Sequence, residues 1–182
     1  MLTIHVKLVE YYDEERSQFV ADVFKLDMEH SLISLSKWES KHERPFLDDS
    51  EKSPEDILEY IKAMTITPDV PDEVFDSLST DNLNEINAYI SAKKTATWFS
   101  EHDKKAKPGA PKETITSELI YYWMLSYNIP MECENWHLNR LFTLIQVFNV
   151  KNSKPKKMTA SERAARNREL NEKRKAQLGT SG

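Results

Sequence analysis

The near absence of glycine is the feature that most narrows what this chain can fold into. Only three of its 182 residues are glycine, at positions 109, 179 and 182. Glycine adopts positive φ angles without a steric cost, and both hairpin-rich β folds and phosphate-binding loops depend on it. The sequence therefore predicts very few residues at positive φ, and it disfavours an all-β fold and a nucleotide-binding loop.

Charge is divided unequally along the chain. Residues 151–182 carry ten Lys/Arg against three Asp/Glu, a net charge of +7, so that residues 1–150 carry −12 within a total of −5. The length allows one ordinary core with an appendage, and not two full domains. A basic tail on an acidic body is typical of a tail that binds nucleic acid, an acidic partner or its own body.

The cysteine content and the N-terminus indicate a cytosolic protein. A single cysteine, Cys133, excludes an intrachain disulfide and leaves no cysteine pair for a zinc site. The N-terminal residues lack the continuous apolar stretch of a secretory signal, and no segment is long and apolar enough to span a bilayer. We therefore expect the protein in a reducing cytosol.

Hydrophobic periodicity predicts a hairpin followed by helices in the first part of the chain. Residues 2–12 and 18–27 alternate apolar and polar residues around a polar turn, which indicates a β-hairpin. A helix is expected from about Ser31 to Pro45, with Ser31 or Ser34 as its cap. A second is expected over residues 53–65, where a serine precedes proline and two acids. A turn follows, and then a helix with Ser79 or Thr80 as its cap.

The rest of the chain predicts a linker, a helix pair and a charged helix. Residues 104–115 combine charge with two prolines and a glycine. Two aromatic helices follow, one opening at Thr116 and closed by Pro130, the other from about Glu134 to Val150. The expected fold is thus α+β and mainly helical, with an N-terminal β-hairpin packed on a helical bundle and an extended basic C-terminal helix. Its parts are 1–103, the linker 104–115, the pair 116–150 and the tail 151–182.

No catalytic or metal-binding pattern is visible in the sequence. The five histidines, at positions 5, 30, 42, 102 and 137, are not within helical spacing of one another, and no serine lies in a nucleophile elbow. Cys133 lies between Glu132 and Glu134, whose negative charge raises a thiol pKa and suppresses the reactive thiolate. We predict no enzyme activity, no cofactor and no metal.

The helix pair and the tail are the candidate binding regions. Aromatic residues occupy more than one side of the two helices. Core packing is the stronger explanation for most of them, but Tyr, Trp and Arg are also enriched at binding hot spots. The tail has no aromatic residue to stack on bases, so nucleic-acid binding would be weak and independent of sequence. The candidate partner-binding residues are Tyr122, Trp123, Trp136, His137, Arg140 and Phe142, and the candidate basic contacts are Lys156, Lys157, Arg163, Arg166, Arg168, Lys173, Arg174 and Lys175.

Several strings, in order, resemble a group of tailed-bacteriophage proteins associated with tail assembly chaperones. They are EHSLISLSKWESKHERPFL, EYIKAMTI, TATWF, ELIYYWMLSYNIPMECENWHLNRLFTLIQVFNVKN, KKM and LNEKRKAQLGTSG, which cover nearly the whole chain. The resemblance implies non-covalent binding, in the host cytoplasm, to the tape measure protein and to tail tube subunits. An acidic body with an exposed apolar helical surface would suit a lysine-bearing amphipathic helix of such a client.

Two alternatives to the chaperone stay open. The chain could be a permanent virion component of the neck, connector or baseplate, with the tail inserted into a neighbouring subunit. It could also be a DNA-binding or packaging factor, in which case DNA binding would be sensitive to salt and lost without residues 151–182. A homo-oligomer is a further possible partner arrangement.

Overall fold

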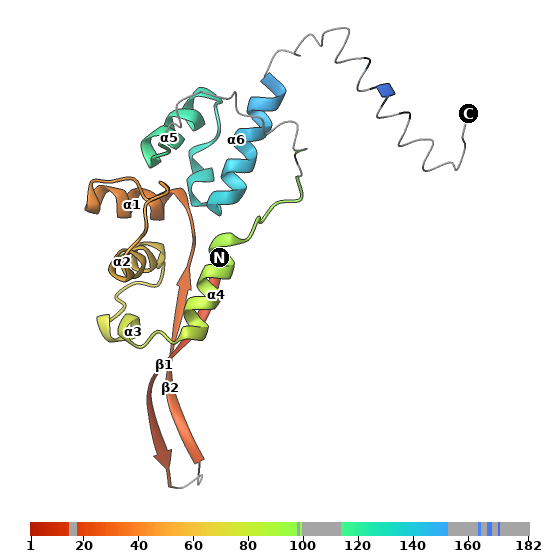
Figure 1. Cartoon of the computed structure of the whole chain (residues 1–182). Coiled ribbons are helices and arrows are strands. Elements are labelled where there is room, and N and C mark those ends of the chain that lie inside the picture. Colours follow the sequence, from red (N-terminus) through yellow and green to blue (C-terminus); the bar gives the residue numbers. More distant parts are fainter. Residues whose placement is uncertain are drawn as a thin grey trace. The chain divides into compact units, whose positions relative to one another are not determined.

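The computed structural model describes residues 1–14, 18–97, 99, 114–152 and four single positions of the tail, 164, 167, 168 and 171. The chain divides into two units, Met1–Val150 and Lys151–Gly182. Figure 1 shows the described strands and helices. The division coincides with the predicted start of the basic tail. The predicted parts 1–103 and 116–150 lie together in the first unit, and the predicted linker, apart from its last two residues, lies outside the described residues.

The chain begins with the predicted hairpin. Strand β1 (Leu2–Asp13) pairs with β2 (Gln18–Met28) in an antiparallel two-stranded sheet. Leu2 lies opposite Met28, and the register shifts between Lys7 and Glu10, where β1 contains one residue more than β2. Such a bulge interrupts the alternation of side chains and changes the local twist of the strands.

Helices α1 (Leu32–His42) and α2 (Pro54–Met64) follow, close to the predicted positions. The Ser31 hydroxyl accepts a hydrogen bond from the Ser34 backbone N–H at the start of α1. In α2, Ser53 and Asp56 form a capping box, in which each side chain accepts from the other residue's backbone N–H. Local cap chemistry was therefore sufficient to place both helix starts.

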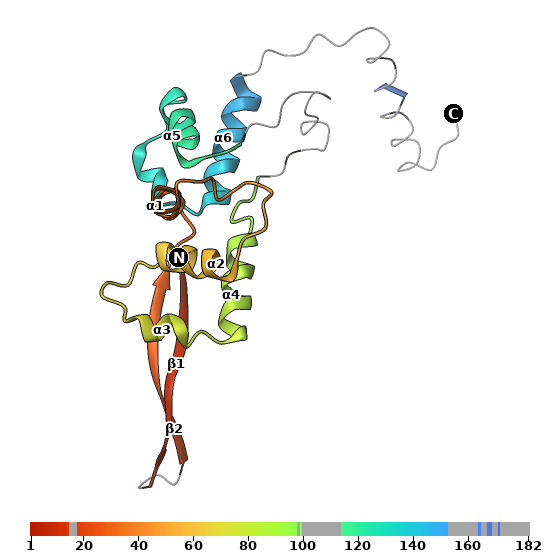
Figure 2. The ribbon, with the colours of Figure 1, turned by 60° about the vertical axis from the view of Figure 1, so that its left-hand side comes forward.

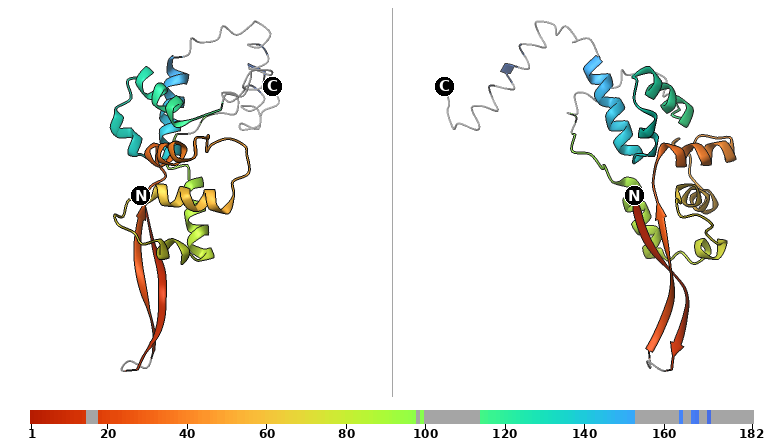
Figure 3. Two further views of the ribbon diagram at one scale, coloured as in Figure 1. Left: turned by 90° about the vertical axis from the view of Figure 1, so that its left-hand side faces the viewer. Right: turned by 180° about the vertical axis from the view of Figure 1, so that it is seen from behind.

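Two further helices lie beside the base of the hairpin. The predicted turn after α2 contains a short helix, α3 (Asp72–Asp76), and α4 (Thr80–Ser91) begins after its cap Ser79. Both α3 and α4 contact β1, and α1 contacts α2 and α5 (Figure 3). The hairpin is thus packed on helices, and the fold is α+β and mainly helical, as expected.

The aromatic helix pair differs from the prediction at its second helix. Helix α5 (Ser117–Ser126) has the expected bounds, but a 3-10 helix, η2 (Met131–Asn135), and an extended Trp136 precede α6 (Leu138–Asn152). The helix expected from Glu134 therefore begins four residues later. The reason is tertiary: the Leu138 N–H donates to the His30 carbonyl (2.7 Å), and His137 forms an antiparallel bridge with Ser31.

One apolar core joins the hairpin base to the helices. It includes residues from both strands and from every α-helix that is described in the first unit. Its buried apolar members are Ile4, Val6, Leu26, Met28, Leu32, Leu35, Trp38, Tyr60, Ile61, Met64, Val74, Phe75, Ile86, Tyr89, Ile120, Met124, Ile129, Cys133, Leu138, Leu141 and Ile145.

The scarcity of glycine does not prevent left-handed backbone conformations. Glu43, Asp69, Lys94 and Asn128 all have φ angles of 49 to 52°. Glu43 is the C-cap of α1, and its backbone N–H donates to the Glu39 carbonyl. A non-glycine residue pays roughly 1 kcal/mol or more for this conformation. The expectation of very few positive φ angles is thus wrong for these exposed turns.

Candidate functional site

Helix α5 buries one side and exposes apolar residues on the other. Ser117, Ile120 and Met124 face the interior, whereas Tyr122 is 63% and Leu125 66% exposed. A helix that is apolar on all sides is normally surrounded by protein or lipid. We call Leu119, Tyr122, Trp123 and Leu125 the α5 patch; Leu119 and Trp123 are half-buried at its borders.

Acidic groups lie on α5 and on the 3-10 helix that follows it. Exposed Glu118 lies one helical turn before Tyr122, and its pKa is lowered by hydrogen bonds, the largest with its own backbone N–H. In η2, Glu132 is exposed and Glu134 accepts a hydrogen bond from the Tyr121 hydroxyl (2.8 Å). Burial, and then Glu134, raise the pKa of Tyr121 to about 12, so this hydroxyl stays a donor. Glu118, one turn before Tyr122, therefore favours a cationic group beside the patch.

A second aromatic feature lies at the start of α6. The Arg140 guanidinium lies 3.8 Å from the centroid of the Trp136 ring, which is a cation–π contact. Arg140 is exposed, while Trp136 is half-buried and packs against the core. Among the described residues, no ring contact or hydrogen bond joins this pair to Tyr122 or Trp123, so the two features are separate.

The remaining candidates of the helix pair have structural positions. Phe142 is half-buried and packs against the core. His137 is only 6% exposed, and burial makes it unavailable to a partner in this conformation. Most of the predicted partner-binding set is therefore partly or wholly engaged in packing, and Tyr122 and Arg140 are its exposed members.

His137 instead belongs to a buried polar network with His30. Its Nδ1 accepts from the Asn139 backbone N–H (3.3 Å), and its Nε2 lies 3.0 Å from the Tyr89 carbonyl oxygen. Because Nδ1 faces a donor and Nε2 an acceptor, the arrangement requires a neutral imidazole with its proton on Nε2. His137 thereby connects the start of α6 to the end of α4.

His30 continues the network towards α2. Its Nδ1 lies 2.7 Å from the Tyr60 hydroxyl, and its ring centroid is 5.2 Å from that of His137. Burial, and then the neighbouring His137, lower the pKa of His30 to about 4, and burial also lowers the pKa of His137. Burial raises the pKa of Tyr60 above its ordinary range. The two imidazoles and the Tyr60 hydroxyl are thus neutral near pH 7. They connect α2, α4 and the start of α6 with the segment between β2 and α1.

The acidic end of this network lies at Glu29, directly after β2. The Tyr89 hydroxyl donates to Glu29 Oε1 (2.5 Å), and the N-terminal ammonium group of Met1 pairs with the same carboxylate. Burial, and then Glu29, raise the pKa of Tyr89. Across the described part of the chain, no three His, Cys, Asp or Glu side chains converge as metal ligands.

Cys133 lies in η2 and is buried. Burial is the largest cause that raises the pKa of its thiol, and Glu132 adds to it. The direction agrees with the sequence argument, but that argument named only the acidic neighbours. A thiol of this kind is a poor nucleophile because little of it is ionised.

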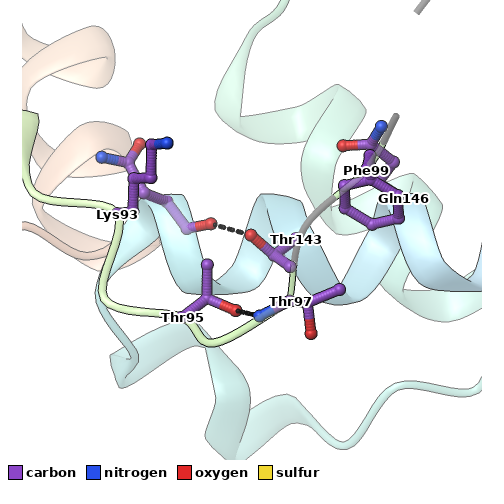
Figure 4. Close-up of a pocket in the computed structure, with 7 residues that line it drawn as sticks. Lys93, Thr95, Thr97, Phe99, Thr143 and Gln146 are labelled. Carbon is purple, nitrogen blue, oxygen red and sulfur yellow. Dashed lines mark hydrogen bonds between the residues drawn. The ribbon is translucent and has the colours of Figure 1, made fainter. Parts of the chain in front are cut away.

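A small cavity lies between α6 and the chain after α4 (Figure 4). Its volume is about 180 Å³, below the roughly 300 Å³ at which ligand pockets usually begin. Thr143 donates to the Asn139 carbonyl (2.9 Å), and the Asn139 amide donates to the carbonyls of Ile90 and Ala92. These polar groups attach α6 to the end of α4, and their role is structural.

The basic tail is described at only a few positions. Arg168 is helical and exposed. The other predicted tail contacts lie outside the described residues: Lys156, Lys157, Arg163, Arg166, Lys173, Arg174 and Lys175.

The chain matches no protein-family model, no curated protein and no solved structure. None of the described helices is long and apolar enough to cross a membrane. The geometry of the chain itself must therefore carry the functional argument, and its strongest feature is the α5 patch.

Proposed function

We propose that this protein is a tail assembly chaperone of a tailed bacteriophage. It acts in the host cytoplasm, without covalent chemistry, by binding the tape measure protein and tail tube subunits during virion morphogenesis. The proposal rests on the sequence strings that resemble this group and on one structural observation. That observation is α5, an apolar helix whose outer side, with Tyr122 and Leu125, is left uncovered.

The α5 patch suits an amphipathic helix as its ligand. Tyr122 and Leu125 are three residues apart, so they lie side by side on the helix surface. Burial of such side chains contributes roughly 25 cal/mol for each Å² of apolar surface removed from water. Exposed Glu118, one helical turn before Tyr122, complements a lysine residue that borders the apolar side of a client helix. In the phage group that the sequence resembles, the tape measure proteins contain long amphipathic helices of this kind.

Co-expression with the tape measure protein of the same phage tests the proposal. The full chain should keep the tape measure protein soluble, and the two should elute together in size-exclusion chromatography. The double variant Tyr122→Ser/Leu125→Ser should lose this effect while keeping its own unfolding temperature, because both side chains are exposed. Ile57→Ser, at an exposed apolar position of α2, is the matched control and should behave like the unchanged chain.

Two results would contradict the proposal. If the double variant kept the tape measure protein as soluble as the unchanged chain does, the α5 patch would not be the binding surface. Abundant peptides of this chain in mass spectra of purified virions would indicate a permanent virion component instead.

A further inference from the structure

The tip of the hairpin is a second unpartnered surface, distinct from the α5 patch. We call residues 9–14 and 18–23 the hairpin tip. The base of the hairpin is buried against the helices, whereas the tip extends past α3 and α4 (Figure 2). Phe19 is 71% and Val23 51% exposed, and Tyr12 is exposed as well. Exposed aromatic residues on both strands are unusual for a free sheet surface.

The strand register puts these side chains on one face. Tyr12 pairs with Phe19, and Glu10 pairs with Ala21. Because side chains alternate along a strand, Phe19, Ala21 and Val23 point to the same side of the sheet as Tyr12 and Glu10. The rings of Tyr12 and Phe19 pack edge to face with centroids 5.2 Å apart. The face is therefore an apolar strip that contains the Glu10 carboxylate, and the exposed Lys7 lies across from Val23 at its inner end.

The outer edge of β2 is occupied at the base and open at the tip. At the base, Met28 bridges Thr65, and the Ile66 N–H donates to the Asp27 carbonyl (2.8 Å). Along β2 from Phe19 to Phe24, no other described segment forms a backbone hydrogen bond with this edge. A two-stranded sheet is marginally stable in water, and an open edge is a template for a further strand.

The net charge of the hairpin tip favours a cationic strand as its binding partner. Residues 9–23 contain five acidic residues and one arginine, a net charge of −4. Among the described positions of the tip, every charged residue is acidic: Glu10, Asp13, Glu14 and Asp22. Two copies of this tip repel each other, whereas a cationic segment is attracted.

We propose that the hairpin tip binds an extended segment of a partner protein that bears lysine or arginine. The segment adds a strand to the outer edge of β2 beside Phe19–Val23. Its apolar side chains pack on Phe19 and Val23, and its cationic side chains, which point to the opposite face, approach Asp22. This mode combines backbone pairing with side-chain specificity, as in other cases of strand addition. It does not depend on the α5 patch or on the identity of the helical client.

A fluorescent peptide that alternates lysine and valine is the probe, with a glutamate–valine peptide of equal length as its control. Fluorescence anisotropy with the full chain should show binding of the lysine peptide that weakens as salt is added. Phe19→Ser/Val23→Ser should weaken it by at least about tenfold, which corresponds to about 1.4 kcal/mol. Asp22→Asn should weaken it and reduce its salt dependence. The α5 variant Tyr122→Ser/Leu125→Ser and the control Ile57→Ser should bind it normally.

Hydrogen exchange tests the strand itself. Backbone amides between Phe19 and Phe24 should exchange more slowly with the lysine peptide bound. The proposal fails if these amides are unaffected, if both peptides bind equally, or if Phe19→Ser/Val23→Ser leaves binding unchanged. It also fails if sedimentation shows a dimer of the chain that Phe19→Ser/Val23→Ser dissociates, because a second copy would then be the occupant. The substituted side chains are exposed, so circular dichroism and thermal unfolding should match the unchanged chain.

Discussion

His30 and His137 are 107 positions apart in the sequence and adjacent in the fold, where both are buried. No local sequence pattern predicts this proximity, because neither histidine has another histidine one helical turn away. The sequence argument therefore treated His30 only as one of five isolated histidines, and it placed His137 on a binding surface. The sequence does not reveal the β-bridge between Ser31 and His137, which brings the two rings together.

The buried His30 makes stability dependent on pH. Its pKa is about 4 in the folded state, against 6.5 ordinarily. Between these values the unfolded chain binds a proton that the folded chain does not, so stability must fall as pH falls from about 6.5 to about 4. The full difference corresponds to at most about 3 kcal/mol. We expect urea unfolding midpoints to decrease over this range, and the variant His30→Gln to decrease less steeply.

His5→Gln is the matched control, because His5 is exposed on β1. It should retain the pH dependence of the unchanged chain. Carboxyl groups whose pKa is lowered by hydrogen bonds, such as Asp27 and Glu59, add a loss of stability at lower pH in all three proteins. Identical slopes for His30→Gln and His5→Gln would show that His30 does not cause the effect.

Between elements, one buried side chain attaches α5 to α1. Glu39 is buried in α1, and its two oxygens accept the backbone N–H of Phe46 (3.0 Å) and of Ser117 (2.7 Å). Ser117 is the first residue of α5, so the acidic side chain also lies at the positive end of that helix. The α5 patch is thus held in place from its buried end.

Removal of the Glu39 acceptors should be costly. Glu39→Ala leaves two buried N–H groups without a partner, and we expect a loss of about 2–5 kcal/mol in the free energy of unfolding. Glu39→Gln keeps one oxygen acceptor and should lose less. Glu85→Ala, at an exposed position of α4, should change the same quantity by less than about 0.5 kcal/mol. Urea denaturation measures all three, and equal values for Glu39→Ala and Glu85→Ala would contradict the assignment.

For the helices and strands, the sequence predicted those boundaries that depend on contacts between residues close together in the chain. The caps Ser31, Ser53 and Ser79 identified three helix starts, because a cap and its N–H partner lie within one turn. The start of α6 was misplaced because a contact with the distant His30 carbonyl overrides the helical tendency of the residues after Glu134. Alternation predicted the hairpin, but it contains no information on where the covering helices end. The exposed tip was missed for this reason.

In the whole molecule, the acidic first unit contains every buried apolar residue that is described, from Ile4 to Ile145. A chain truncated after Asn152 should therefore fold as the full chain does. It loses nine Lys/Arg and three Asp/Glu, so its net charge changes from −5 to −11. We expect an unchanged thermal midpoint and later elution from an anion exchanger. A truncated chain that unfolds without cooperativity would mean that the tail belongs to the folding unit.

The charge asymmetry between body and tail was visible in composition alone, and so was the boundary near residue 150. Composition does not show on which surfaces of the first unit the acidic residues lie. Part of it lies on α5 and η2, at Glu118, Glu132 and Glu134, and another part lies on the hairpin tip, at Glu10 and Asp22. Only the pairing of distant residues distinguishes these two acidic regions.

The left-handed turns at Glu43, Asp69 and Lys94 have a practical consequence for protein engineering. All three are exposed, and none belongs to the α5 patch or the hairpin tip. Glycine at such positions relieves steric strain, although the greater freedom of the unfolded chain offsets part of the gain. These turns are therefore places where the scaffold can be made more heat-resistant for crystallography while both proposed binding surfaces keep their native residues.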